Sequence, residues 1–111
     1  MKGDHLGEFE ELVLLAVHGL DGQAYGVSVQ QLLDRETHRA VSLGAVYAAL
    51  DRLEGKQLVV SQMAPGTAMR GGRSRRVFQL SAEGVRSLDA IRRVRERLYT
   101  AGRARTTRSR A

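Results

Sequence analysis

One stretch, residues 41–80, constrains the fold of this 111-residue chain more than any other. Its first part spaces apolar side chains at helical intervals, and a run rich in β-branched residues, 58–63, follows as an expected strand. A second expected strand, 75–80, lies beyond a segment with a Pro-Gly pair, a Gly-Gly pair and several arginines. Such pairs form turns, so the two strands are predicted to form an antiparallel hairpin. A helix followed at once by a basic hairpin is the arrangement of a winged helix.

The rest of the chain is predicted to be mostly helical. Apolar residues in 6–20 recur at intervals of three and four, and an Asp-Gly pair ends that run. A second helix is expected over 26–38, Ser42 is a suitable N-cap for the third, and a fourth is expected over 81–101. The last residues, 102–111, have no apolar periodicity and are expected to be disordered.

These elements define a mainly α chain with a small β-hairpin (α+β). We expect a winged helix-turn-helix domain over 1–80, a C-terminal dimerisation helix over 81–101 and a basic tail over 102–111. A core of this size is small, so stabilisation by dimerisation is expected.

The net charge of +6 is unevenly distributed. Residues 1–40 carry three basic and seven acidic side chains, 41–80 carry six and two, and 81–111 carry nine and three. An acidic N-terminal part and a basic remainder favour a polyanionic partner that binds the basic part, residues 41–111. The alternative is a solubility bias combined with a disordered tail.

The third helix is predicted to be the DNA recognition helix. Its expected buried stripe is Leu43, Val46, Tyr47, Leu50 and Leu53. The residues expected on the opposite face are Ala45, Ala48, Ala49 and Arg52. In a major groove, alanine methyls can pack on thymine methyls and Arg52 can reach a guanine or a phosphate, while Ser42 at the helix N-terminus suits phosphate oxygens. The alternative is an alanine-rich helix without a partner.

The hairpin is the second predicted DNA contact. Its arginines, which no acid accompanies, are Arg70, Arg73, Arg75 and Arg76. Each phosphate that they neutralise would release counterions and steepen the salt dependence of binding, and arginine prefers narrow minor grooves. The alternative is a solvated hairpin tip.

The fourth helix has an apolar arc too wide for a solvated surface helix. Part of it should cover the core, and the rest should meet a second copy together with the first helix. The residues predicted at this dimer interface are Phe9, Leu12, Leu88, Ile91, Val94, Leu98 and Tyr99. The alternative is packing within one monomer only.

No enzymatic chemistry is predicted. The chain has no cysteine, its three histidines show no ligand spacing, and nucleophile-elbow, Walker and dinucleotide fingerprints are absent from the sequence. Neither a metal nor a cofactor is therefore expected. No apolar run approaches the roughly 20 residues that a membrane span needs, and no export signal is visible. We expect a cytoplasmic protein, associated with the nucleoid when bound to DNA.

Four ordered blocks carry a family resemblance: LGEFEELVLLAV (6–17), AYGVSVQQLL (24–33), VSLGAVYAALDRLEGKQLV (41–59) and RGGRSRRVFQLSAEG (70–84). Together they resemble the PadR family of bacterial transcriptional regulators, and the short C-terminal part is similar to the branch with one dimerising helix. The resemblance implies a homodimeric repressor, often controlling its own operon and a neighbouring transporter or stress gene. It also implies that Tyr25 and Tyr47 belong to the family's structural or DNA-facing tyrosines, and that the hairpin arginines touch DNA.

The chain departs from this family pattern at two points. Many members have glycine where this chain has Gln57, so either Gly55 ends the third helix or Gln57 adopts a left-handed conformation at some cost. The chain also has no tryptophan, whereas multidrug-binding relatives stack flat ligands between tryptophans at the dimer interface.

The sequence thus predicts a homodimeric transcriptional repressor that binds double-stranded DNA at a roughly palindromic operator. Two alternatives stay open. One is a sensor that binds a small apolar effector at the dimer interface, and the other is an interaction module that has lost DNA binding.

Overall fold

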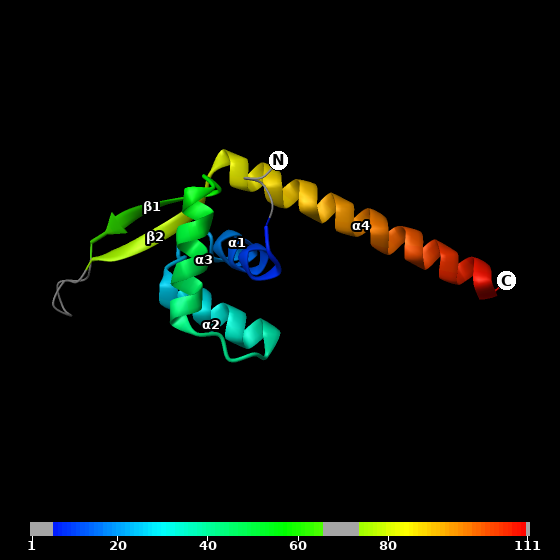
Figure 1. Ribbon diagram of the computed structural model, residues 1–111, viewed down its shortest axis with the longest axis horizontal. Helices are drawn as coiled ribbons and strands as arrows, with labels where there is room; N and C mark the ends of the chain where they lie inside the picture. The colour runs from blue at the N-terminus through cyan, green and yellow to red at the C-terminus, as the bar shows by residue number, and fades with distance from the viewer. Residues whose placement is uncertain (1–5, 66–73, 111) are drawn as a thin grey trace.

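The structure, a computed structural model, describes residues 6–65 and 74–110. Within these residues the order of elements is α1 (Glu8–Leu20), α2 (Gly26–Thr37), α3 (Leu43–Gly55), β1 (Val59–Ala64), β2 (Arg75–Leu80) and α4 (Ala82–Arg110). The predicted class, mainly α with a small hairpin, is confirmed. Helices α1, α2 and α3 form a compact head, the hairpin extends to one side of it, and α4 projects to the other side (Figure 1).

The ends of α1 and α2 follow from local backbone chemistry. Helix α1 ends at Asp21, which adopts a left-handed φ of 40°, and Gly22 follows with φ 87°. Helix α2 ends at His38, with φ 56°, whose N–H donates to the Asp34 carbonyl at 3.0 Å. Left-handed residues are common at the ends of helices because they satisfy the last carbonyls. The predicted end of the first helix at residue 20 and the predicted start of the second at residue 26 are confirmed, while α1 begins two residues later and α2 ends one residue earlier than expected.

Helix α3 is capped at both ends by identifiable residues. The Ala45 N–H donates to Ser42 Oγ at 3.1 Å, which confirms the predicted N-cap. At the other end Gln57 has φ 64°, its N–H donates to the Glu54 carbonyl at 2.9 Å, and the Leu58 N–H donates to the Leu53 carbonyl at 2.9 Å. This pair of bonds is a Schellman motif. Gln57 therefore occupies a left-handed position where glycine would be unstrained.

The hairpin is tied to the head by main-chain hydrogen bonds. Strands β1 and β2 pair antiparallel, with Val59 opposite Leu80 and Met63 opposite Arg76. The Phe78 N–H donates to the Ala24 carbonyl at 2.8 Å, so the segment before α2 adds a bridge to β2. The predicted hairpin is confirmed, while its turn residues 66–73 lie outside the described residues.

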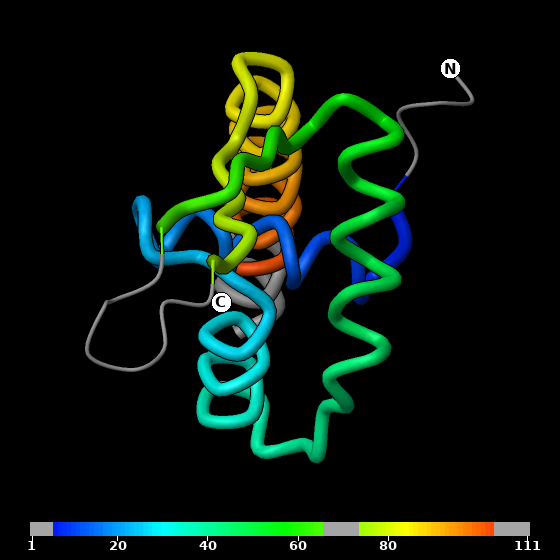
Figure 2. The backbone as a smooth tube through the Cα atoms, turned by 90° about the vertical axis from the view of Figure 1, so that its left-hand side faces the viewer, coloured from blue at the N-terminus to red at the C-terminus, as the bar shows by residue number. Residues whose placement is uncertain are grey.

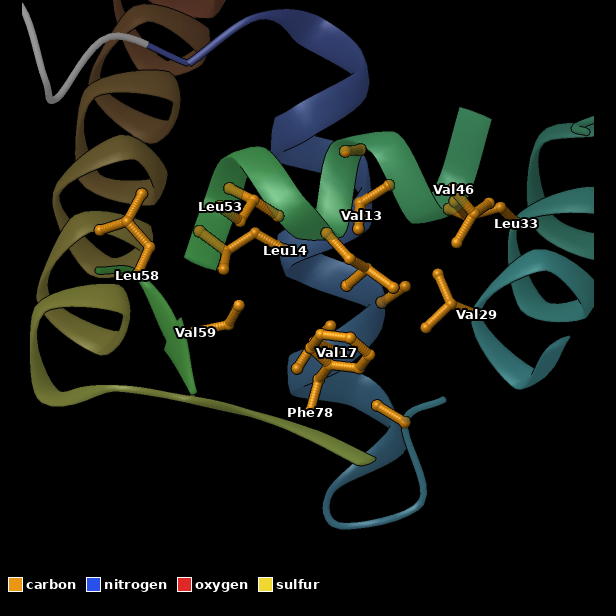
Figure 3. Close-up of a cluster of buried hydrophobic side chains, with 14 of the residues drawn as sticks. Val13, Leu14, Val17, Val29, Leu33, Val46, Leu53, Leu58, Val59 and Phe78 are labelled. Atoms are coloured by element: carbon orange, nitrogen blue, oxygen red, sulfur yellow. The ribbon is translucent and has the colours of Figure 1, made fainter. Parts of the chain in front are cut away.

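The core lies where α1, α2, α3 and the hairpin meet. Figure 3 shows Val13, Leu14 and Val17 along α1 at the centre, Val46 of α3 next to Leu33 of α2, and Phe78 of β2 beside Val17. Leu88 of α4 joins this core and is only 9% exposed. Leu88, which was predicted at the dimer interface, is thus largely covered within its own monomer.

Helix α4 is longer than the sequence pattern indicated. It continues to Arg110 instead of ending near Ala101, so the expectation of a disordered tail is wrong for residues 102–110. Alanine and arginine are good helix formers, and cations near a helix C-terminus suit its dipole. A missing apolar stripe reports a lack of burial and does not by itself exclude a helix. Figure 2 views α4 nearly along its axis, and in that view the helix lies behind the head.

In 6–65 and 74–110, no helix has the length and apolar content needed to cross a membrane.

Candidate nucleic-acid interface

Helix α3 presents an outward face beside the hairpin. Its exposed predicted DNA-binding residues are Ser42, Ala45, Tyr47, Ala48 and Arg52. Ala49 was predicted on this face, but it is completely buried in the core with Val46 and Leu50. That prediction is wrong because the inner face of α3 is centred on residues 46, 49, 50 and 53, where a small side chain lets α3 pack closely on its neighbours.

Tyr47 lies at the edge of this face rather than in the predicted buried stripe. Tyr47 is 41% exposed, and its ring packs against Gly26, the first residue of α2. A Cβ atom at position 26 would lie 2.3 Å from the Tyr47 Cζ and 2.4 Å from its hydroxyl oxygen. Gly26 is thus required for this close approach. Tyr47 has both a structural contact and a surface to offer a partner.

Tyr25 joins the hairpin to the same region. The Arg75 guanidinium lies 4.2 Å from the centroid of the Tyr25 ring, a cation–π distance. Arg75 itself is exposed at the start of β2. The adjacent residues Tyr25 and Gly26 therefore contact the hairpin and α3, respectively. The sequence did not indicate this link beyond the family resemblance.

Arg76 of β2 connects the hairpin to α3 by pairing with acidic side chains of that helix. The guanidinium pairs with Glu54 and, at 3.3 Å, with Asp51, while its Nε donates to Ser61 Oγ at 3.1 Å. Ser61 in turn donates to Glu54 Oε2 at 2.7 Å. This network holds the hairpin against the helix. Arg70 and Arg73, which were also predicted to contact DNA, lie outside the described residues.

Glu10 of α1 forms a second link to α3. Arg52 Nε donates to Glu10 Oε2 at 2.6 Å, and Lys56 Nζ donates to Oε1 at 2.7 Å. Burial raises the pKa of Glu10, but the hydrogen bonds from Lys56, Arg52 and the Gly7 N–H outweigh burial and hold the pKa below the ordinary glutamate value. The side chain is therefore a carboxylate at neutral pH. Sequence reasoning missed this role because the partners lie more than 40 residues away along the chain.

The candidate dimer surface is distributed over α1 and α4. Val94, Leu98 and Tyr99 are 46%, 67% and 74% exposed, whereas Phe9, Leu12 and Ile91 are only partly exposed. Two further exposed residues, Leu15 and Val85, were not predicted. Together with Leu80 and Ile91, they line a groove of about 460 Å³ between α1 and α4.

The rim of this groove is charged. Arg95 of α4 donates to both carboxylate oxygens of Glu11 of α1, at 2.6 and 2.9 Å. Glu11 raises the pKa of Arg95 further above its usual range through this hydrogen bond. The bidentate pair therefore fixes α4 to α1 within one monomer.

The described residues contain no group of three histidine, cysteine, aspartate or glutamate side chains that would hold a metal ion.

The N-capped helix exposed beside a hairpin defines a winged helix-turn-helix protein. More particularly, a model of the Transcriptional regulator PadR-like family matches residues 14–90, and the chain belongs to this family. The family comprises transcriptional regulators and not enzymes, which agrees with the absence of a predicted active site. Among curated proteins, none matches the chain significantly.

Solved structures share this fold. A PadR-like transcription factor from Bacteroides fragilis is 23% identical, with a TM-score of 0.71 over 86% of this chain and 87% of that chain. A PadR family regulator from Clostridium difficile is 25% identical, with a TM-score of 0.67 over 91% and 99%. PadR from Bacillus subtilis, solved in complex with operator DNA, is 12% identical, with a TM-score of 0.63 over 75% of this chain and 45% of that chain.

Proposed function

We propose that the chain is a homodimeric DNA-binding repressor that controls its own operon or a neighbouring one. The observation that carries the proposal is the outward face of α3, capped by Ser42 and placed beside the exposed Arg75 of the hairpin. Membership of a family of transcriptional regulators supports it, and so does the operator complex of the Bacillus subtilis relative.

Each exposed group suits a different part of a DNA duplex. Ser42 and the N-terminal N–H groups of α3 suit phosphate oxygens, and the methyls of Ala45 and Ala48 suit thymine methyls in the major groove. Arg52 has the donors to recognise a guanine edge. Arg75, stacked on Tyr25, would meet the backbone, and the arginines predicted in the hairpin turn would reach the minor groove or the backbone beyond.

Dimerisation through α1 and α4 would complete the binding unit. The apolar side chains of Val94, Leu98 and Tyr99 are exposed on α4, and a second copy would bury them. Two copies related by a twofold axis would place their recognition helices about one DNA turn apart, which corresponds to a roughly palindromic operator.

Fluorescence anisotropy with the DNA upstream of the protein's own gene tests this proposal. A scrambled duplex is the control, and both are titrated at two salt concentrations. We expect a preference for the upstream DNA and a steep salt dependence. Equal, weak binding to both duplexes would contradict specific autoregulation and shift weight to an interaction module, which a salt-insensitive complex with a protein would support.

A substitution that introduces a negative charge then tests the face of α3. Ala48→Glu would place a carboxylate against DNA phosphates, and we expect at least about a tenfold loss of affinity, since like charges at an interface cost several kcal/mol. Ala82→Glu makes the same charge change at an exposed residue of α4 and is the matched control. Equal losses in the two variants would sink the assignment of α3.

The groove between α1 and α4 favours a second candidate function, a repressor that senses a small apolar molecule. Its volume of about 460 Å³ and its lining by Leu15, Val85 and Ile91 suit such a ligand. Thermal stabilisation by hydrophobic compounds, accompanied by weaker DNA binding, would support this function. A melting temperature unaffected by such compounds would favour a repressor without an effector.

A further inference from the structure

We propose that Glu10 is a positioning residue for DNA recognition, which holds Arg52 of α3 in one orientation and limits the charge that α3 offers to phosphates. The inference rests on the proposed function, because it concerns how α3 would meet DNA. It assigns a role in DNA recognition to a side chain on α1, whereas the helix proposed to face the DNA major groove is α3.

The burial of Glu10 is the first argument. Among the residues that the structure describes, it is the one buried charged side chain, with a side-chain exposure of 9%. Removing a carboxylate from water costs several kcal/mol unless paired groups compensate. Here both oxygens are engaged, one by Arg52 in the last turn of α3 and the other by Lys56, the C-cap residue that follows it. A buried ion pair is weak evidence for stability, so a role in fixing geometry is the better explanation.

The orientation of Arg52 is the second argument. A guanidinium carries five N–H donors, and Glu10 accepts from the one on Nε. The side chain remains 53% exposed, so its outer part lies on the solvent side of α3. A side chain fixed before DNA arrives loses less rotamer entropy on binding, out of a total of about 2 kcal/mol for arginine. Arg52 is thereby prepared for bidentate recognition of a base.

The charge of the cluster is the third argument. Glu10 offsets one of the two positive charges of Arg52 and Lys56, so the pair attracts phosphates less strongly than it would alone. Attraction to phosphates is independent of sequence, whereas contacts to base edges carry specificity. Offsetting this charge therefore lowers non-specific affinity more than specific affinity. The expected result is a higher ratio between the two.

Glu10→Gln tests the proposal, because glutamine keeps the size of the side chain and removes its charge. Anisotropy titrations on the upstream and scrambled duplexes give the slope of log affinity against log salt. We expect the slope on the scrambled duplex to steepen by about 0.9 for each cation that gains a phosphate. Between 200 and 50 mM salt this adds roughly 3.5-fold in affinity for each such cation, and the preference for the upstream duplex falls.

Glu83→Gln is the matched control. It makes the same charge change at an exposed residue of α4, where Glu83 pairs with Arg86 and not with α3. We expect its salt slopes to equal those of the wild type. Steepening by the same amount in both variants would mean that net charge alone acts, and would overturn the role of Glu10.

Arg52→Lys gives a second test that does not depend on Glu10→Gln folding well. Lysine keeps the charge but has no planar fork for bidentate contacts. We expect the salt slope on the scrambled duplex to persist and the preference for the upstream duplex to fall. An unchanged preference would overturn the proposal, and so would a Glu10→Gln variant that weakens both duplexes equally with unchanged slopes. If the wild type itself shows no preference, the proposed function fails first, whatever the Glu10 variants do.

Discussion

Gly84 offers the sharpest test of how α4 is joined to the head. It lies in the first turn of α4, where an added Cβ would be 2.1 Å from the carbonyl oxygen of Leu58 and 3.1 Å from its carbonyl carbon. Because real Cβ atoms keep at least 3.0 Å from such atoms, Gly84→Ala would force the two backbones about 0.9 Å apart. The same Leu58 oxygen accepts from the Ser81 N–H at 3.0 Å, so the shift would also weaken the bond that begins α4.

The magnitude follows from three opposing effects. Overpacking a close backbone contact costs about 2 kcal/mol, and loss of the hydrogen bond costs about 1 kcal/mol. Alanine in a helix recovers up to about 1 kcal/mol relative to glycine. We therefore expect Gly84→Ala to lower the free energy of unfolding by about 2 kcal/mol, and the melting temperature by roughly 8 °C for a chain of this length.

The control is the same substitution at Gly55, the last residue of α3, where an added Cβ meets nothing within 4 Å. Gly55→Ala should raise stability by about 0.5 kcal/mol through helix propensity and reduced unfolded-state entropy. Both variants are compared with the wild type by urea and thermal denaturation at one protein concentration, because the proposed dimerisation would make the melting temperature concentration-dependent. If Gly84→Ala proves as stable as the wild type, the close packing of α4 on Leu58 is refuted.

Two further predictions concern residues held by tertiary structure. Gln57→Gly should raise the free energy of unfolding by about 0.5–1 kcal/mol, because relief of the left-handed strain exceeds the entropy cost of glycine. The control is Gln62→Gly, at an exposed position of β1, which should lower the free energy of unfolding measured by urea denaturation. If both variants lower this free energy, Gln57 is not strained. The lowered pKa of Glu10 means that its contribution to stability is present above the ordinary glutamate value of about 4.3 and is lost as the pH falls through the lower folded-state value. Between pH 7 and pH 3 the melting temperature should therefore fall less steeply for Glu10→Gln than for the wild type. Parallel curves of melting temperature against pH would contradict a lowered pKa of Glu10.

The local elements could be predicted because their signals are local. Ser42 caps α3 and the Asp21-Gly22 turn ends α1, since these groups act on backbone within a few residues of themselves. Hydrophobic periodicity was less reliable at Tyr47 and Ala49. It ranks residues by polarity, but close packing of α3 buried the small alanine and left the larger tyrosine at the edge.

The long-range contacts of the candidate site could not be predicted in the same way. In the sequence Glu10 is only an acid in the first turn of a helix, where the dipole favours it. Its partners Arg52 and Lys56 come close only after α1 packs against α3. Similarly, the contact of Arg75 with Tyr25 depends on the bridge between β2 and the segment before α2.

The number of arginines overstates the number of phosphate contacts that this chain would make. Between residues 41 and 80 the sequence has six basic side chains and two acids, and both acids pair with Arg76. Glu10, from outside that stretch, engages Arg52 and Lys56, so three of the six basic groups already have carboxylate partners. A phosphate must share or displace those carboxylates and gains less than it would from a solvated arginine. The steep part of the salt dependence should then come from Arg75 and from the hairpin-turn arginines. A basic stretch therefore predicts the class of partner, whereas the arginines that act depend on where distant acids fold.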